Sequence, residues 1–195
     1  MDFKGILVQL CKVPALNARF INTLSFLEYV GARKILKSQH ESLVTYRLIN
    51  HMLEELRHAQ LLKRVALKMS DGKLETYSDD HLLCGQEARR YIQTVDFAPE
   101  IEVPWLNYLL TTLMLEERAN LIYPDYEPLL AQAGFPGVLK AIVTEEDVHL
   151  RDVIRNLGRE TSISAYQLNR LREIESEAFQ RFADSIEAEI TATAR

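Results

Sequence analysis

Hydrophobic residues recur at steps of three and four along most of the chain, which is the period of an α-helix. The first long stretch with this pattern runs from Ala15 to Leu36, and the second runs from Leu43 to about Ser70. The polar segment 38–42 between them predicts a turn, and Gly72 favours a helix stop after the second stretch. The two stretches therefore predict a pair of antiparallel helices.

A less regular segment, 73–104, follows this pair and is expected to contain a short helix from about Ser78 to Val95. The next long helix is predicted from Trp105 to Tyr123, because Pro104 suits a first turn and Pro124 cannot continue the hydrogen-bond ladder. The segment between the two long helices is therefore interpreted as a long crossover.

The sequence Gly-Phe-Pro-Gly at 134–137 marks another break, and a helix is predicted beyond it from Val138 to Leu157, stopped by Gly158. A last amphipathic helix is predicted from Ser164 to Ile190. No strand-like alternation of any length occurs, so the predicted class is all-α. Two helical pairs joined by a long crossover form a known type of four-helix bundle, here with an extra C-terminal helix. The apolar stripe of that helix either caps the bundle or forms the seam of a homodimer.

Length, charge and cysteine content limit the number of domains, the cellular compartment and the kinds of partner that we expect. A chain of 195 residues fits one domain, 1–195, with its core helices within about 15–157. The net charge of −5 gives no overall footprint for nucleic acid, and no segment reaches the roughly 20 unbroken apolar residues that cross a bilayer. Cys11 and Cys84 are too few for a disulfide framework, and residues 1–10 lack the cleavage site of an export signal. We therefore expect a cytoplasmic protein with neither a membrane nor nucleic acid as its partner.

Two Glu-x-x-His motifs carry the candidate chemistry, Glu55 to His58 in the second predicted helix and Glu146 to His149 in the helix that ends at Leu157. A spacing of three residues puts the carboxylate and the imidazole on the same helix face, so that one metal ion can bind both. A single motif arises easily by chance. Two copies, each on the second helix of its pair, predict a metal site.

Each partner helix has to supply a further carboxylate at the same height. Glu28 is the sole acidic residue of the first long helix, and the midpoint between it and Glu55 falls in the predicted turn, so the two are level. The third long helix offers both Glu116 and Glu117. We prefer Glu116, which shares an apolar stripe with Leu113, and Glu117 stays open as the alternative ligand.

Together these residues predict a two-metal centre with mixed oxygen and nitrogen ligands. Such ligands suit iron or manganese, and the absence of thiolates argues against a closed structural zinc site. Two iron ions are therefore the expected cofactor, with manganese as the alternative. The predicted ligands are Glu28, Glu55, His58, Glu116, Glu146 and His149. In the opposing interpretation these acids belong to solvated faces, and the agreement of motif order and helix height is a coincidence.

Residues beside the motifs are expected to support the ligands. Glu54 and Glu145 each precede a motif and are candidates to accept the second ring N–H of a ligating histidine. Arg57 is expected to balance part of the negative charge. His51 shares a helix face with Glu55 and is interpreted as a hydrogen-bonded core histidine, with an extra ligand as the alternative. Four tyrosines are interpreted as core aromatics, with bonding to the site as the alternative: Tyr29, Tyr46, Tyr108 and Tyr123.

The order Glu, Glu-x-x-His, Glu, Glu-x-x-His over about 16–157 resembles that of the ferritin-like di-iron carboxylate proteins. The acidic-Glu-x-Arg-His sequence at 54–58 is similar to the signature of their oxygen-activating members, including bacterial multicomponent monooxygenases. The short spacings within each helical pair resemble those of the cyanobacterial aldehyde-deformylating oxygenases. The segments 54–64 and 116–118 resemble the tRNA hydroxylase that acts on methylthio-isopentenyl adenosine. The resemblance implies a ferritin-like bundle that holds two metal ions.

These observations predict an oxygen-activating oxidase or hydroxylase that acts on an organic substrate. Dioxygen or peroxide and an external electron donor are its expected partners, since no flavin or nicotinamide fingerprint occurs in the sequence. The first alternative is iron oxidation or peroxide scavenging of the ferritin or rubrerythrin type. The others are a tRNA-modifying hydroxylase and a metal that only stabilises the bundle.

Overall fold

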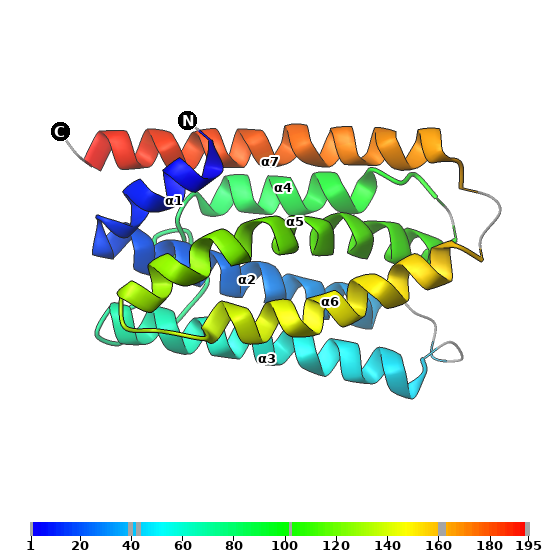
Figure 1. The fold of residues 1–195 in the computed structure, drawn as a ribbon, viewed down its shortest axis with the longest axis horizontal. Coiled ribbons are helices and arrows are strands. Elements are labelled where there is room, and N and C mark those ends of the chain that lie inside the picture. The colour runs from blue at the N-terminus through cyan, green and yellow to red at the C-terminus, as the bar shows by residue number, and fades with distance from the viewer. Residues whose placement is uncertain (1, 39–40, 42–43, 102, 160–162, 194–195) are drawn as a thin grey trace.

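Seven α-helices make up nearly all the regular structure of the described residues, which are 2–38, 41, 44–101, 103–159 and 163–193 of the computed structural model (Figure 1). The helices are α1 Phe3–Cys11, α2 Pro14–Ser38, α3 Tyr46–Met69, α4 Gly85–Phe97, α5 Pro104–Gln132, α6 Val138–Leu157 and α7 Ala165–Thr193. The predicted all-α class is therefore confirmed. As far as the described residues go, none of these helices combines the length and the apolar character needed to span a membrane.

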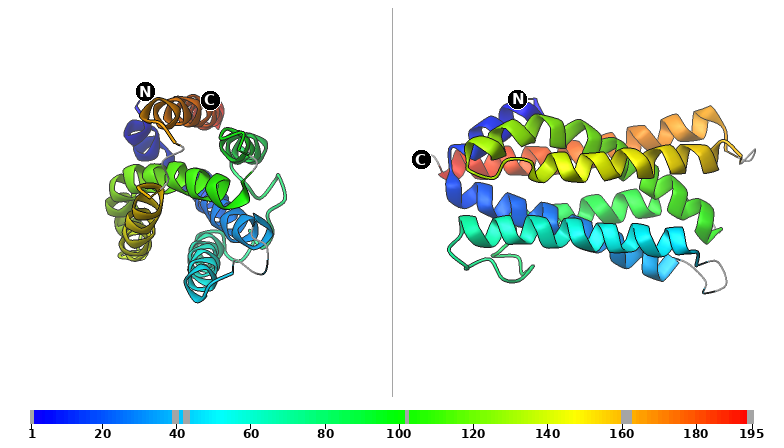
Figure 2. Two further views of the ribbon diagram at one scale, coloured as in Figure 1. Left: turned by 90° about the vertical axis from the view of Figure 1, so that its right-hand side faces the viewer. Right: turned by 60° about the horizontal axis from the view of Figure 1, so that its bottom comes forward.

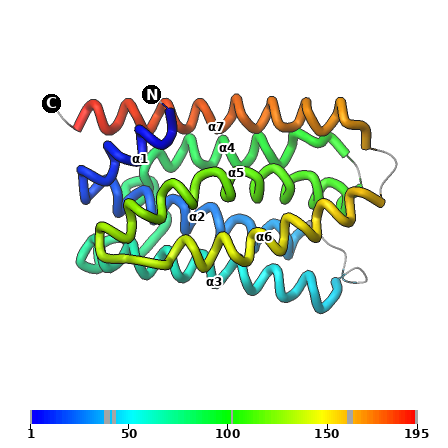
Figure 3. Tube along the Cα trace, viewed as in Figure 1, coloured from blue at the N-terminus to red at the C-terminus, as the bar shows by residue number. Residues whose placement is uncertain are grey.

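Successive helices from α2 to α7 run in opposite directions (Figure 1, Figure 3). α2 packs along α3 and α5 packs along α6, so the chain forms the two antiparallel pairs that its hydrophobic pattern predicts. The connection from α3 to α5 contains α4, which runs back along the other helices before α5 begins. Figure 2 shows three layers in its end-on view: α3 with α6, then α2 with α5, and then α4 with α7 and α1.

Several helix ends lie close to where the pattern predicts them. α6 has its predicted bounds, and α7 is close to its predicted range. α3 begins at Tyr46, because Thr45 has an extended backbone and its side-chain oxygen accepts the Leu48 N–H at 3.2 Å. Most of the predicted turn, 38–42, lies outside the described residues.

The predicted end of a helix at Pro124 is wrong, because α5 continues through Pro124 and Pro128. A proline inside a helix removes one backbone donor and costs about 3 kcal/mol or more. The packing of the continued segment offsets this cost: Tyr126 and Leu130 are fully buried, and the Tyr126 ring lies 5.6 Å from that of Phe20. Tertiary burial therefore overrides the local signal.

The pattern predicts no helix at the N-terminus, yet α1 is present there. Asp2 caps it by accepting the Gly5 N–H at 2.9 Å, and Leu7 and Leu10 are fully buried among α2, α5 and α7. A helix of so few turns shows too little periodicity to stand out in the sequence.

The crossover helix α4 begins later than the predicted range 78–95, at Gly85. Cys84, just before it, has a left-handed backbone with a φ of 51°, which interrupts a right-handed helix. The turns before it are held against α2, where the Thr23 hydroxyl accepts the Leu83 N–H at 2.8 Å. The predicted helix is therefore too long at its N-terminal end.

The C-terminal helix α7 covers the other helices with its own apolar stripe. Its buried apolar residues are Leu171, Ala178, Phe179, Phe182, Ala183 and Ile186. They pack against α4 and α1, and the rings of Phe179 and Tyr91 lie 5.8 Å apart. The stripe therefore caps the other helices, which is one of its two predicted uses.

Candidate metal centre

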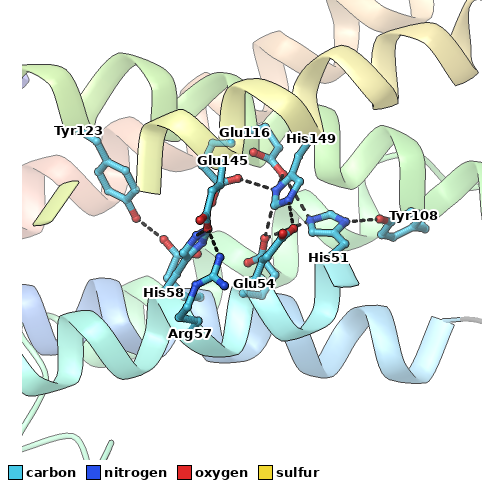
Figure 4. Close-up of polar contacts among 12 residues, drawn as sticks. His51, Glu54, Arg57, His58, Tyr108, Glu116, Tyr123, Glu145 and His149 are labelled. Carbon is cyan, nitrogen blue, oxygen red and sulfur yellow. Dashed lines mark hydrogen bonds and ion pairs between the residues drawn. The ribbon is translucent and has the colours of Figure 1, made fainter. Parts of the chain in front are cut away.

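Four helices bring the predicted ligands together near the middle of the bundle (Figure 4). The six residues are Glu28 on α2, Glu55 and His58 on α3, Glu116 on α5, and Glu146 and His149 on α6. With His51 they form two groups, in each of which the candidate ligand atoms all lie within 4.8 Å of one another. The first group is Glu28, Glu55, His58 and Glu146, and the second group is His51, Glu55, Glu116 and His149. Among the described residues, Glu55 alone belongs to both groups.

The cluster is buried and rich in carboxylates. Glu116 is only 5% exposed and Glu146 only 3%, and burying ionised carboxylates without compensation is costly. One buried atom of the cluster, Glu116 Oε2, has no hydrogen-bond partner among the described residues. Atoms with free lone pairs that converge in a buried space are what a cation would satisfy. The residues therefore fit a pair of metal ions.

Carboxylates outside the cluster orient both motif histidines. His58 Nε2 donates to Glu145 Oε2 at 2.7 Å, and His149 Nε2 donates to Glu54 Oε2 at 2.7 Å. Each histidine thus uses the acid of the opposite helix, so the pairs link α3 and α6 in both directions (Figure 4). The two Nδ1 atoms then face inward, where they lie 2.8 and 3.1 Å from oxygens of Glu146. Such partners fix the tautomer that presents a lone pair to a metal.

Two other residues predicted from the sequence, Arg57 and Glu117, lie outside the two groups. Arg57 Nη2 donates to Glu145 Oε2 at 2.5 Å, so its charge reaches the cluster through that carboxylate. Glu117 turns outward and accepts two bonds from the Arg172 guanidinium of α7, at 2.9 and 2.6 Å. Glu116, not Glu117, is therefore the α5 carboxylate that lies in the cluster.

His51 lies inside the cluster and not apart from it. Its Nε2 atom is 3.1 Å from Glu55 Oε1 and 3.6 Å from Glu116 Oε1. Its other nitrogen, Nδ1, is 2.7 Å from the Tyr108 hydroxyl (Figure 4). The ring centroids of His51 and His149 are 4.0 Å apart. The spacing in the sequence predicts that His51 shares a helix face with Glu55. It does not predict that His51 also approaches residues of α5 and α6.

The tyrosines differ in their surroundings. Tyr123 donates a short hydrogen bond to Glu28 Oε1, so both Tyr108 and Tyr123 bond to the cluster. Tyr29 stacks on Tyr77 at a centroid distance of 5.5 Å. Tyr46 is 79% exposed, so the interpretation as a core aromatic is wrong there, because this first residue of α3 points to solvent.

Gly31 on α2 is a residue of the centre that sequence reasoning missed. A Cβ atom at this position would lie 2.9 Å from Glu55 Oε2, closer than real Cβ contacts. A helix interior disfavours glycine relative to alanine by about 0.5–1 kcal/mol, so the absence of a side chain here has a local cost. The glycine therefore leaves space for the shared carboxylate.

We expect Gly31→Ala to weaken metal binding without unfolding the protein. The new methyl group displaces the Glu55 carboxylate, and the helix itself gains from alanine. Misplacing one ligand is expected to lower metal affinity by about 10–100-fold, the range typical for loss of a partner that orients a ligand. Metal titration measures this, with the exposed Lys37→Ala on the same helix as control. Equal affinity in both variants would contradict this role of Gly31.

The metal-free cluster holds protons that a metal must displace. Burial lowers the pKa of His149, but hydrogen bonds with Glu116 and Glu146 outweigh it and raise the pKa to about 11. Burial likewise opposes the rise for His58, whose pKa reaches about 10 because of Glu146 and Glu28. For Glu116, burial and the neighbouring Glu146 both raise the pKa, to about 8. The two histidines are therefore protonated at neutral pH when no metal is bound.

Metal uptake at pH 7 is accordingly expected to release protons, at least one from each of these two histidines. Since both pKa values lie above 7, affinity should rise as the pH rises from 7 towards 10, where fewer protons have to be displaced. A pH-indicator dye in weak buffer measures the release. An affinity that stays constant between pH 7 and 10 would contradict the expectation.

An apolar cavity of about 140 Å³ adjoins the cluster. Residues of α2, α4, α5 and α7 supply most of its wall. Carboxylates of the cluster, including Glu28 and Glu116, form part of its wall. Most of the other lining residues are apolar, among them Leu24, Leu27, Ile92, Leu115, Phe179 and Phe182.

No protein-family model, no curated protein and no solved structure matches the chain. The fold and the cluster define an all-α protein with buried histidine and glutamate groups that can hold metal ions.

Proposed function

We propose that the chain is a ferritin-like di-iron carboxylate protein that activates dioxygen and oxidises an organic substrate, with di-manganese as the alternative cofactor. One observation carries the proposal: two groups of metal-binding atoms share Glu55 and lie beside an apolar cavity. A four-helix bundle with one Glu-x-x-His motif on each of two helices and one glutamate on each of the others is a known way to hold such a pair of ions.

The donor set supports iron or manganese over a structural zinc ion. The predicted ligands are carboxylates and imidazoles without a thiolate, and Cys11 and Cys84 are free. Two bound iron ions would supply the redox chemistry that dioxygen requires. Free thiols also suit the cytoplasm, which we propose as the compartment.

The chain's own residues then have three tasks. Glu54 and Glu145 hold the imidazoles in position, and Tyr123 holds Glu28. The cavity walls bind an apolar substrate next to the carboxylates and exclude water. Electrons come from a separate donor protein, since no flavin or nicotinamide fingerprint occurs in the sequence.

Anaerobic reconstitution with ferrous ion tests the proposal. We expect two irons per chain, and after oxygen is admitted a Mössbauer spectrum of a coupled ferric pair. A protein that stays metal-free with its ligands intact would overturn the proposal. If each assembly instead stored many irons, or oxidised ferrous ion repeatedly without an organic substrate, the ferritin or rubrerythrin alternative would hold.

Glu116→Ala separates a reactive centre from a metal that only stabilises the fold. Removal of a structural metal unfolds its protein, whereas a reactive centre loses oxygen consumption and keeps its helices. We expect retained helical circular dichroism and lost oxygen consumption. The control is Glu117→Ala, on the same helix but outside the cluster.

A further inference from the structure

The two Glu-x-x-His motifs account for two imidazoles of the cluster, but the part of the chain that the structure describes places a third one there. His51 is 8% exposed, and its Nε2 atom faces the oxygens of Glu55 and Glu116 at 3.1 and 3.6 Å. These oxygens belong to the second group of metal-binding atoms, as does His149. The position of His51 is therefore that of a ligand in this group.

Comparing the two groups shows what His51 adds. The first group contains four side chains from the predicted ligand set: Glu28, Glu55, His58 and Glu146. Without His51, the second group would contain only three, namely Glu55, Glu116 and His149. With His51 both positions have four, and the second has two imidazoles where the first has one.

Tyr108 gives His51 the outer partner that a ligating histidine needs. The Tyr108 hydroxyl lies 2.7 Å from His51 Nδ1, on the side of the ring away from the carboxylates. When Nδ1–H donates a hydrogen bond to this hydroxyl, Nε2 carries no proton and presents its lone pair to the cluster. Glu145 and Glu54 do the same for His58 and His149.

We propose that His51 is a metal ligand, so that the centre has two unequal positions. The inference rests on the proposed two-metal site. One position has two imidazoles and two carboxylates, and the other has one imidazole and three carboxylates. Imidazole nitrogen is a better ligand for Co²⁺ than a carboxylate oxygen is, so the position with His51 and its two imidazoles binds the first Co²⁺ ion. Loading of the centre is therefore ordered.

Titration of the metal-free protein with Co²⁺ tests the order in which the two positions bind metal. Wild type is expected to bind in two steps of unequal affinity. His51→Gln should weaken the tighter step by about 10–100-fold or more and leave the other step nearly unchanged. Tyr108→Phe should weaken the same step, by less. His81→Gln is the matched control, because His81 bonds to Thr76 away from the cluster, and both steps should persist.

A second test counts the ligating imidazoles in the wild-type protein, so its result does not depend on whether the variants fold. In the Co²⁺-loaded protein each ligating imidazole gives one paramagnetically shifted, exchangeable N–H proton signal, so three are expected, from His51, His58 and His149. Two bound ions with only two such signals would overturn the inference and leave the proposed function standing. A protein that binds no Co²⁺ or iron would overturn both.

Discussion

Glu55→Gln is expected to weaken both metal positions at once. Among the described residues Glu55 alone belongs to both groups, and Gly31 leaves the space for its carboxylate. Glutamine keeps the size of the side chain, but it removes the negative charge that two divalent ions would share. We expect a loss of affinity above about 100-fold, since even residues that merely orient a ligand contribute 10–100-fold. Metal analysis after equilibrium dialysis measures the bound ions per chain.

Two comparisons make this experiment specific. Glu28→Gln and Glu116→Gln should each weaken one position, because each residue belongs to one group only. Glu117→Gln should change neither, because that carboxylate pairs with Arg172 outside the cluster. If Glu55→Gln lost no more metal than Glu117→Gln, Glu55 would not be the shared ligand.

The height of the ligands in the bundle is predictable because helix geometry is regular. An α-helix rises by a constant amount per residue, so two residues equally far from a tight turn are level on an antiparallel pair. Glu28 and Glu55 are placed in this way from the sequence alone, and the structure brings them into one group.

Contacts between helices that are distant in the sequence are not predictable in this way. The exchange of acids between α3 and α6 depends on the rotation of each helix about its axis, which the hydrophobic pattern fixes only roughly. The cavity depends on where α4 and α7 lie, and neither helix carries a motif. The space beside Gly31 depends on a side chain of another helix, so it has no local signature.

A second large effect is expected at the ion pair between Arg118 of α5 and Glu175 of α7. The guanidinium donates two bonds to the carboxylate, at 2.8 and 2.5 Å, and the Tyr91 hydroxyl donates a third at 2.8 Å. The side chains of Arg118 and Glu175 are 19% and 7% exposed. Removing one partner of such a pair leaves an uncompensated buried charge, which costs about 3–5 kcal/mol.

Arg118→Met should therefore lower the free energy of unfolding by about 3–5 kcal/mol, with the apolar part of the side chain retained. Arg172→Met is the matched control. Arg172 and Glu117 also form an ion pair between α7 and α5, but this pair is exposed, with side chains 46% and 30% accessible. An exposed pair contributes at most about 1 kcal/mol. Urea unfolding followed by circular dichroism measures both. Adding Glu175→Leu to Arg118→Met should restore most of the lost stability, because the second change removes the buried charge. Equal losses of stability in Arg118→Met and Arg172→Met would refute the difference between the buried and the exposed ion pair.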